Sequence, residues 1–309
     1  MHIVGVKMKN KIKSTALLFL TAIIWGFAFV AQRVGADYVG AFTFNGVRFI
    51  LGACSLIPVI LIFEKEEFNK KKFIKTLWTG ILAGVILFIA SSLQQFGIVF
   101  TGSAGKAGFL TGLYIVLVPL IRFVMGKKTS VLTFFGAIFA VIGLFFLCMT
   151  GDKITFGIGD IVLIIGAFFW ASHILVVDKF VNSISALKFS MIQFYTCGIL
   201  SMIFAMFTET IEFSAIKEAG IPILYGGLMS VGVAYTCQIL GQKNADPTFA
   251  SIVFSTESVF GAIGGALILH EMMSGRGYLG CILIFIGIIL SQITINDIKK
   301  LKNRRLKNN

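Results

Sequence analysis

Ten apolar stretches of about 20 residues follow one another along this 309-residue chain, with only short polar connections between them. A helix needs about 20 mostly apolar residues to cross the hydrocarbon core of a bilayer. A helix also satisfies its own backbone hydrogen bonds, which lipid cannot do. The expected spans cover residues 14–33, 42–63, 77–98, 104–125, 131–149, 158–177, 187–208, 220–241, 248–269 and 277–296. The sequence therefore predicts an all-α polytopic membrane protein with ten transmembrane helices.

The composition excludes several other classes of protein. Hydrophobic residues make up 57% of the chain and charged residues 13%, whereas soluble proteins average about 45–50% and about 25%. A soluble enzyme or a secreted domain of this size could not bury so much apolar surface. The net charge of +13 would suggest a nucleic-acid partner in a soluble protein. Here the basic residues gather at the termini and in a few loops, so we expect a lipid bilayer as the partner and no nucleic acid.

The distribution of Lys and Arg predicts the orientation in the membrane. If both termini are cytoplasmic, 21 of the 27 Lys and Arg residues fall on the cytoplasmic side and 5 on the outer side, and Arg48 lies within a span. Cytoplasmic loops of membrane proteins carry an excess of basic residues. We therefore expect a multi-pass protein of the cytoplasmic membrane with both termini inside.

The second half of the sequence repeats features of the first half at a shift of 144–145 residues. The matched pairs are Trp25 with Trp170, Phe44 with Phe189, Phe49 with Phe194, Gln94 with Gln238, Gly97 with Gly241, Ser130 with Ser274, Gly136 with Gly280, and Gly143 with Gly287. Each repeat, over residues 14–149 and 157–296, contains five spans. Because five is odd, the second repeat enters the membrane from the opposite side. Inverted repeats with a site at their interface are a transporter architecture, in which the halves exchange conformations around the site.

Several short motifs carry a resemblance to a known family. They are Trp25-Gly26, Arg48-Phe49, the segment 109–119, Glu257-Ser-Val-Phe, His270-Glu271, and the glycines Gly136, Gly143, Gly280 and Gly287. In this order, over essentially the whole chain, they resemble the EamA branch of the drug/metabolite transporter superfamily. Ser258 stands where that family usually has proline, and Lys127 where its first repeat often has glutamate. The resemblance implies export of amino acids, related metabolites or toxic compounds through a central cavity.

Glu257 is the acidic residue closest to the middle of any predicted span. A charged side chain at the bilayer centre costs roughly 2.5–3.5 kcal/mol on insertion scales, so such residues are rare and often functional. Burial disfavours the ionised form. Glu257 is therefore a candidate for coupling proton movement to transport or for facing a cationic group of a substrate. The alternative is a structural hydrogen bond between helices.

Further polar and aromatic side chains within the spans are candidates for lining a substrate cavity. Gln94 and Gln238 are repeat partners and should lie symmetrically about the pseudo-two-fold axis, although hydrogen bonds between helices would also explain them. The complete set of candidates is Trp25, Gln94, Gln95, Tyr114, Trp170, His173, Tyr235, Gln238 and Glu257. For the aromatic residues, ordinary packing is the alternative. His173 and Asp178 imitate an acyltransferase His-x4-Asp signature, but no accompanying catalytic segment is present.

Two basic residues lie within or at the edge of predicted spans. Arg48 sits about two turns into the second span with Asn45 one turn before it, and we interpret it as an intramembrane structural anchor. Lys106 begins the fourth span, where its ammonium can snorkel outward or attract a carboxylate in an outer vestibule.

The remaining sequence features narrow the function. The chain has no phosphate-binding loop, and its five cysteines and three histidines show no metal-ligand spacing, so we expect neither ATP drive nor a metal or cofactor. Glycines at i, i+4 in three spans permit close helix approach and leave a homodimer open. We predict a secondary transporter that exports amino acids or related small metabolites by alternating access. A membrane-embedded enzyme such as a lipid transferase, or a channel-like scaffold, is the alternative.

Overall fold

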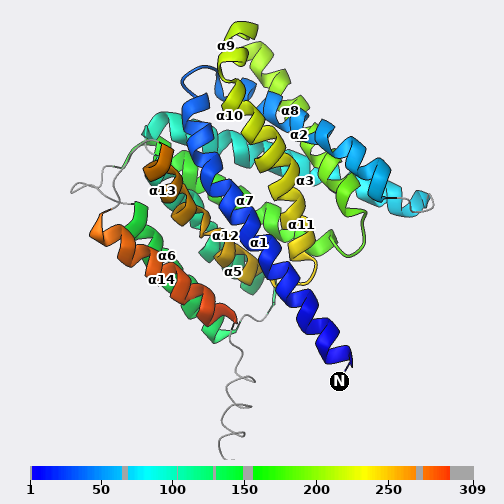
Figure 1. Cartoon of the computed structure of the whole chain (residues 1–309), viewed down its shortest axis with the longest axis vertical. Coiled ribbons are helices and arrows are strands. Elements are labelled where there is room, and N and C mark those ends of the chain that lie inside the picture. The colour runs from blue at the N-terminus through cyan, green and yellow to red at the C-terminus, as the bar shows by residue number, and fades with distance from the viewer. Residues whose placement is uncertain are drawn as a thin grey trace, which may run out of the picture.

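The computed structural model describes residues 2–64, 69–102, 104–127, 130–148, 156–268 and 274–292, and every regular element in these ranges is helical (Figure 1). Of these helical segments, nine are long and apolar enough to cross a membrane, and Gly275–Ser291 is a shorter apolar helix. These segments lie where the ten spans were expected. The predicted ten-helix fold is confirmed.

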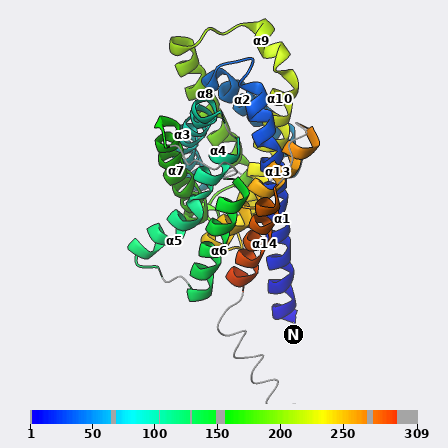
Figure 2. The ribbon, with the colours of Figure 1, turned by 90° about the vertical axis from the view of Figure 1, so that its left-hand side faces the viewer.

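The spans of the first repeat are α1 (His2–Gly35), α2 (Ala41–Phe63), α3 (Lys70–Thr101), the pair α4 (Ala104–Gly112) and α5 (Tyr114–Val124), and α6 (Val131–Cys148). The second repeat contains α7 (Ile158–Phe180), α8 (Ala186–Thr208), the series α10 (Gly220–Leu224), η1 (Tyr225–Tyr235) and α11 (Thr236–Gln242), the pair α12 (Pro247–Phe254) and α13 (Glu257–Ile268), and α14 (Gly275–Gln292). A short helix outside the spans, α9 (Phe213–Glu218), was not expected. It lies at the end of the molecule opposite to the start of α1 (Figure 2).

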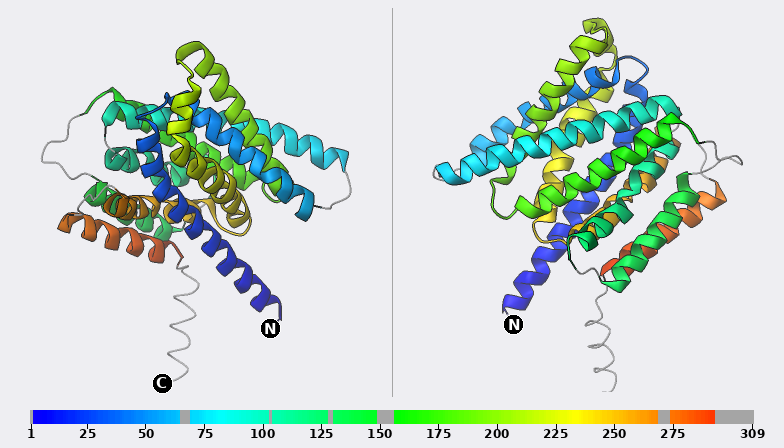
Figure 3. Two further views of the ribbon diagram at one scale, coloured as in Figure 1. Left: turned by 45° about the horizontal axis from the view of Figure 1, so that its top comes forward. Right: turned by 180° about the vertical axis from the view of Figure 1, so that it is seen from behind.

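Equivalent helices of the two repeats pack against each other in two antiparallel pairs. One pair is α6 with α14, which run side by side in both views of Figure 3. At this contact, an added Cβ on Gly143 would lie 2.6 Å from the carbonyl oxygen of Gly280, and one on Gly136 would lie 2.5 Å from that of Gly287. No other residue fits at such a distance without moving the backbone. The matched glycines of the repeat therefore let these two helices touch backbone to backbone.

The second pair is α2 with α8, and a carboxylate ties it at each end. Glu209, directly after α8, accepts hydrogen bonds from the backbone N–H groups of Phe42 and Thr43, both at 2.8 Å, and from Thr43 Oγ1 at 2.7 Å. Glu64, directly after α2, accepts a hydrogen bond from Ser185 Oγ and lies 3.8 Å from Lys188 Nζ. The two glutamates are 145 residues apart, which is the repeat shift of these spans. Each therefore holds the start of the partner helix.

Three spans depart from a regular α-helix. The fourth span breaks at Leu113, between α4 and α5, and its repeat equivalent breaks at Ser255–Thr256, between α12 and α13. Ser255 and Thr256 donate side-chain hydrogen bonds to the carbonyls of Ile252 and Val253 at 2.6 and 2.7 Å, which satisfy backbone oxygens near the break. The middle of the eighth span, η1, is a π-helix of 11 residues. Discontinuous membrane helices and π-turns are both common at functional sites.

Candidate functional site

A cavity lies between the two repeats, next to the helix breaks. Its lining comes from α1, α2, α3, α4 and α5 of the first repeat and from α7, η1, α11, α12 and α13 of the second. The free space inside it that a water-sized sphere can occupy is about 30 Å³. Small-molecule sites typically measure about 300–1,000 Å³. In this conformation the cavity is therefore smaller than a typical small-molecule site, and a metabolite fits only when the helices that line the cavity move apart.

Most of the side chains singled out in the sequence meet at this cavity. Its lining includes Trp25, Arg48, Gln94, Tyr114, Trp170, Tyr235, Gln238 and Glu257. Two candidates lie behind the wall because other protein groups bind them. Gln95 Nε2 donates to the carbonyl of Gln32 at 3.2 Å, and His173 Nε2 is hydrogen-bonded to Gln193 Oε1 at 2.9 Å. The side chain of Lys106, like residues His270 and Glu271, lies outside the part of the chain that the structure describes.

Aromatic rings form one wall of the cavity. The ring centroids of the repeat partners Trp25 and Trp170 are 6.4 Å apart, and Tyr235 lies 4.7 Å from Trp25 and 6.3 Å from Trp170. Trp25 Nε1 donates a hydrogen bond to the carbonyl of Ser230 within η1 at 3.3 Å. Trp170 Nε1 is buried without a hydrogen-bond partner among the described residues. This wall combines flat apolar faces with one unused donor.

The helix breaks bring an acid and a phenol together. Tyr114 is the first residue of α5 and Glu257 the first residue of α13. The Tyr114 hydroxyl donates a hydrogen bond to Glu257 Oε1 at 2.9 Å, and only 5% of Glu257 is exposed. The N-terminal turn of a helix favours a negative charge. A hydrogen bond in which Glu257 is the acceptor thus joins the two discontinuous spans near the middle of each.

Arg48 combines the contacts of a structural anchor with a place in the cavity lining. It was interpreted as a structural anchor, and the structure does bury it, with 4% of the residue exposed and Nε donating to Asn45 Oδ1 at 3.0 Å. The guanidinium carbon lies 5.3 Å from the centroid of the Phe44 ring and 5.0 Å from that of Phe49. The same side chain also lines the cavity. Arg48 therefore brings a positive charge to the site.

Amide side chains complete the polar lining. Gln94 and Gln238, the repeat partners, both face the cavity. Gln238 donates to Gln242 Oε1 at 3.0 Å, and its own Oε1 is buried without a partner in the described structure. Sequence reasoning missed Gln32, whose Oε1 is also buried and unpartnered. A signal was present, because Gln32 follows Trp25 by seven residues and so lies on the same helix face.

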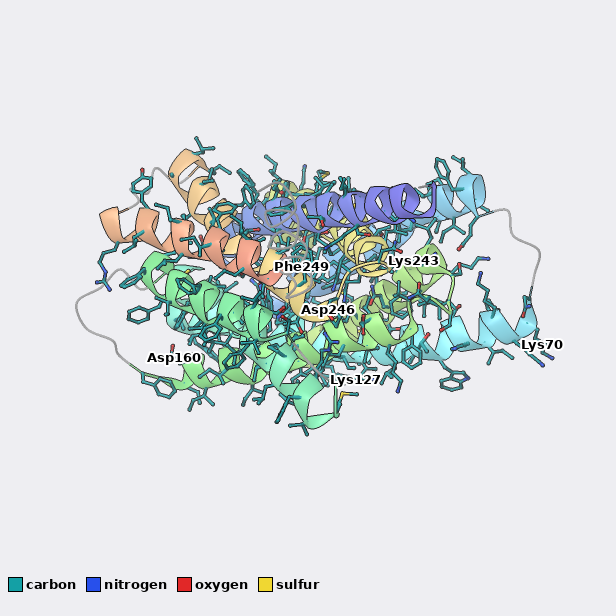
Figure 4. All side chains as sticks on the ribbon, turned by 90° about the horizontal axis from the view of Figure 1, so that it is seen from below. Lys70, Lys127, Asp160, Lys243, Asp246 and Phe249 are labelled. Carbon is teal, nitrogen blue, oxygen red and sulfur yellow. The ribbon has the colours of Figure 1, made fainter. Side chains whose placement is uncertain are left out.

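An ion pair ties the two discontinuous spans at one end of the molecule. Arg122 Nη1, near the end of α5, lies 2.5 Å from Asp246 Oδ2 and 3.1 Å from Thr248 Oγ1, at the start of α12. Figure 4 looks onto the end at which α1 starts and shows Asp246 near the middle of the view. The repeat-equivalent positions at the other end are Gly102 and Ala266, which carry no charge.

Comparisons with known proteins agree with this architecture. The model of the EamA-like transporter family matches residues 12–149 and 157–293. A protein of Archaeoglobus fulgidus named "Uncharacterized transporter" is 26% identical over 282 residues, which cover 90% of this chain and 85% of that protein. "Uncharacterized transporter YoaV" of Bacillus subtilis is 22% identical over 283 residues, which cover 89% and 94%. A solved crystal structure has a TM-score of 0.76 at 17% identity and covers 90% of this chain and 95% of its own. The chain belongs to the EamA-like transporter family.

Proposed function

We propose that this transporter exports amino acids or related small metabolites across the cytoplasmic membrane by alternating access. The Glu257–Tyr114 hydrogen bond carries the proposal, because it joins the two broken spans of the inverted repeats inside the cavity. A substrate or proton that changes this bond acts on both repeats at once. The substrate class and the direction follow from the family resemblance. Both termini face the cytoplasm, since most of the Lys and Arg residues then lie on that side.

Glu257 couples proton movement to substrate movement in this proposal. An ionised carboxylate buried at mid-membrane must be compensated, and a proton or a cationic group of the substrate can do this. When Glu257 is protonated, its side chain is neutral and does not attract a cationic group of the substrate. When the proton leaves, the carboxylate attracts the cationic group instead. Proton and substrate thus compete for one side chain, and a proton gradient can drive the substrate in the opposite direction.

The experiment uses purified protein in proteoliposomes, a panel of amino acids, and an imposed pH gradient. The wild-type protein is expected to move a subset of the panel faster with the gradient than without it. Glu257→Gln keeps the shape and a hydrogen-bonding group but cannot titrate. It mimics the protonated state, so it should bind and exchange substrates that carry a cationic group more weakly, and it should lose the flux that the gradient drives. Glu257→Asp should retain part of that flux.

The control is Glu212→Gln. Glu212 is exposed at the start of α9, does not line the cavity, and makes no capping hydrogen bond with its side chain. This variant should match the wild type. Gradient-driven flux at the wild-type rate in Glu257→Gln would remove the coupling role. Steady flux of panel compounds with no saturation and no response to the gradient would favour a channel. A wild-type protein that moves no member of the panel would contradict the proposed substrate class.

A further inference from the structure

The protein binds the Arg48 guanidinium at Nε, and no described residue binds its two terminal nitrogens. Nε donates to Asn45 Oδ1, the rings of Phe44 and Phe49 flank the guanidinium, and Gly226 of η1 packs against the stem, with an added Cβ 3.2 Å from Cδ of Arg48. Among the described residues, the two terminal nitrogens have no hydrogen bond and no ion pair. A guanidinium carries five N–H donors. The contacts that hold Arg48 in place therefore use one donor and leave the fork of terminal nitrogens unassigned.

An arginine with a purely structural role would have protein partners for its terminal nitrogens and for its charge. A guanidinium keeps its charge in proteins, and an uncompensated charge within a bilayer is costly. In the part of the chain that the structure describes, Glu257 is the only acidic residue that lines the cavity, and it makes no ion pair with Arg48. The cavity is thus lined by one guanidinium and one carboxyl group that do not pair with each other in the described structure.

We propose that Arg48 is the anion subsite of the cavity and that the transported molecule places a carboxylate on its terminal nitrogens. The inference rests on the transport function proposed above and adds a requirement to it. A guanidinium fork matches the two oxygens of a carboxylate in a bidentate pair. Arg48 is the only cation in the described lining. One positive charge balances a carboxylate, whereas a phosphate monoester carries close to two negative charges at neutral pH.

The position of the subsite also orients the substrate. The rest of the molecule contacts the other side chains that line the same cavity, which include Trp25, Trp170, Tyr235 and Glu257. A molecule that carries both a carboxylate and an ammonium can satisfy both groups. An amine without a carboxylate leaves Arg48 unpaired in the membrane, and the same holds for an amide. The subsite therefore selects by the presence of the anion and not by the shape of the side chain.

The test measures binding to the full-length protein purified in detergent, through the fluorescence of its tryptophans. The probes are matched sets, each with an amino acid, its primary carboxamide and the corresponding decarboxylated amine. For each amino acid that binds, the carboxamide and the amine should bind roughly 10- to 100-fold more weakly, as expected when charge-assisted hydrogen bonds are lost. Arg48→Gln should bind the amino acid as weakly as the carboxamide. Arg48→Lys should retain part of the preference, and Arg33→Gln, an exposed arginine paired with Asp37, should retain all of it.

The comparison within the wild-type protein needs no variant to fold. Equal affinity for an amino acid and its carboxamide in the wild type would overturn the proposal, and so would a wild type that binds none of the carboxylates. A full preference retained in Arg48→Gln would overturn it as well. The transport proposal fails separately. Carboxylate-selective binding without gradient-driven flux in vesicles would support the anion subsite and refute proton-driven export. Gradient-driven flux of amides and amines as fast as that of acids would refute the anion subsite and support proton-driven export.

Discussion

Removal of the Glu209 carboxylate should destabilise the whole protein, although Glu209 does not line the cavity. Glu209→Ala deletes the acceptor of three hydrogen bonds, two from backbone N–H groups in the first turn of α2 and one from the buried hydroxyl of Thr43. Loss of a helix N-cap costs about 0.5–2 kcal/mol, and loss of a negative charge near a helix N-terminus costs about 0.3–1 kcal/mol. Together they predict a loss of about 2 kcal/mol.

The assay is thermal unfolding of the purified protein in detergent, followed by the loss of helical signal. A loss of about 2 kcal/mol should lower Tm by about 3–6 °C for a chain of this length. Glu212→Ala is the matched control, since Glu212 is exposed and its side chain makes no capping bond. Glu64→Ala should behave like Glu209→Ala, because it removes the repeat-equivalent contact at the other end of the same helix pair. Equal Tm values for Glu209→Ala and Glu212→Ala would refute the reasoning.

Three further outcomes are expected. Gln94→Ala and Gln238→Ala should each slow transport at near-normal protein levels, because both amides line the cavity; normal kinetics in both would exclude them from the site. Gly143→Leu should prevent folding, at a cost of about 3 kcal/mol or more, because its side chain would meet a carbonyl oxygen of the facing helix; a single sharp peak in size-exclusion chromatography would contradict this. On a cysteine-free background, cysteine at Lys70 should react from the cytoplasmic side and cysteine at Thr210 from the outside. Labelling of the Thr210 position only from the cytoplasmic side would refute the orientation.

The positions of the spans could be predicted from sequence because length and hydropathy decide them. The breaks within spans could not. Leu113 and the pair Ser255–Thr256 interrupt their spans without a proline at the break. An apolar stretch has the same hydropathy whether its backbone hydrogen bonds are continuous or not. The π-helical turns of η1 are hidden for the same reason. Only packing against the neighbouring helices determines where a backbone of this kind departs from the α-helix.

The sequence predicted which types of residue form the candidate site. It did not predict for each residue whether its side chain lines the cavity. Adjacent helix positions differ in direction by about 100°, so Gln94 and Gln95 cannot both face one cavity. The sequence does not say which of them turns inward. His173 resembles a lining residue until its partner Gln193, from a neighbouring helix, is known. Arg48 resembles a structural anchor because its Nε donates a hydrogen bond to Asn45, one turn earlier on the same helix. For Gln95 and His173 the deciding neighbour, Gln32 or Gln193, lies on another helix.

The repeat gives the two halves the same order of spans, and side chains make the two ends of the molecule different. Arg122 pairs with Asp246 at one end, whereas their repeat equivalents at the other end are Ala266 and Gly102. In the proposed cycle, separation of the fourth and ninth spans at the Arg122 end therefore breaks an ion pair, whereas the described residues of these spans form no ion pair at the opposite end. The Asp246 side chain is 51% exposed, so the pair contributes at most about 1 kcal/mol. That corresponds to a factor of about five between the two open states, a bias small enough for a substrate or a proton to reverse.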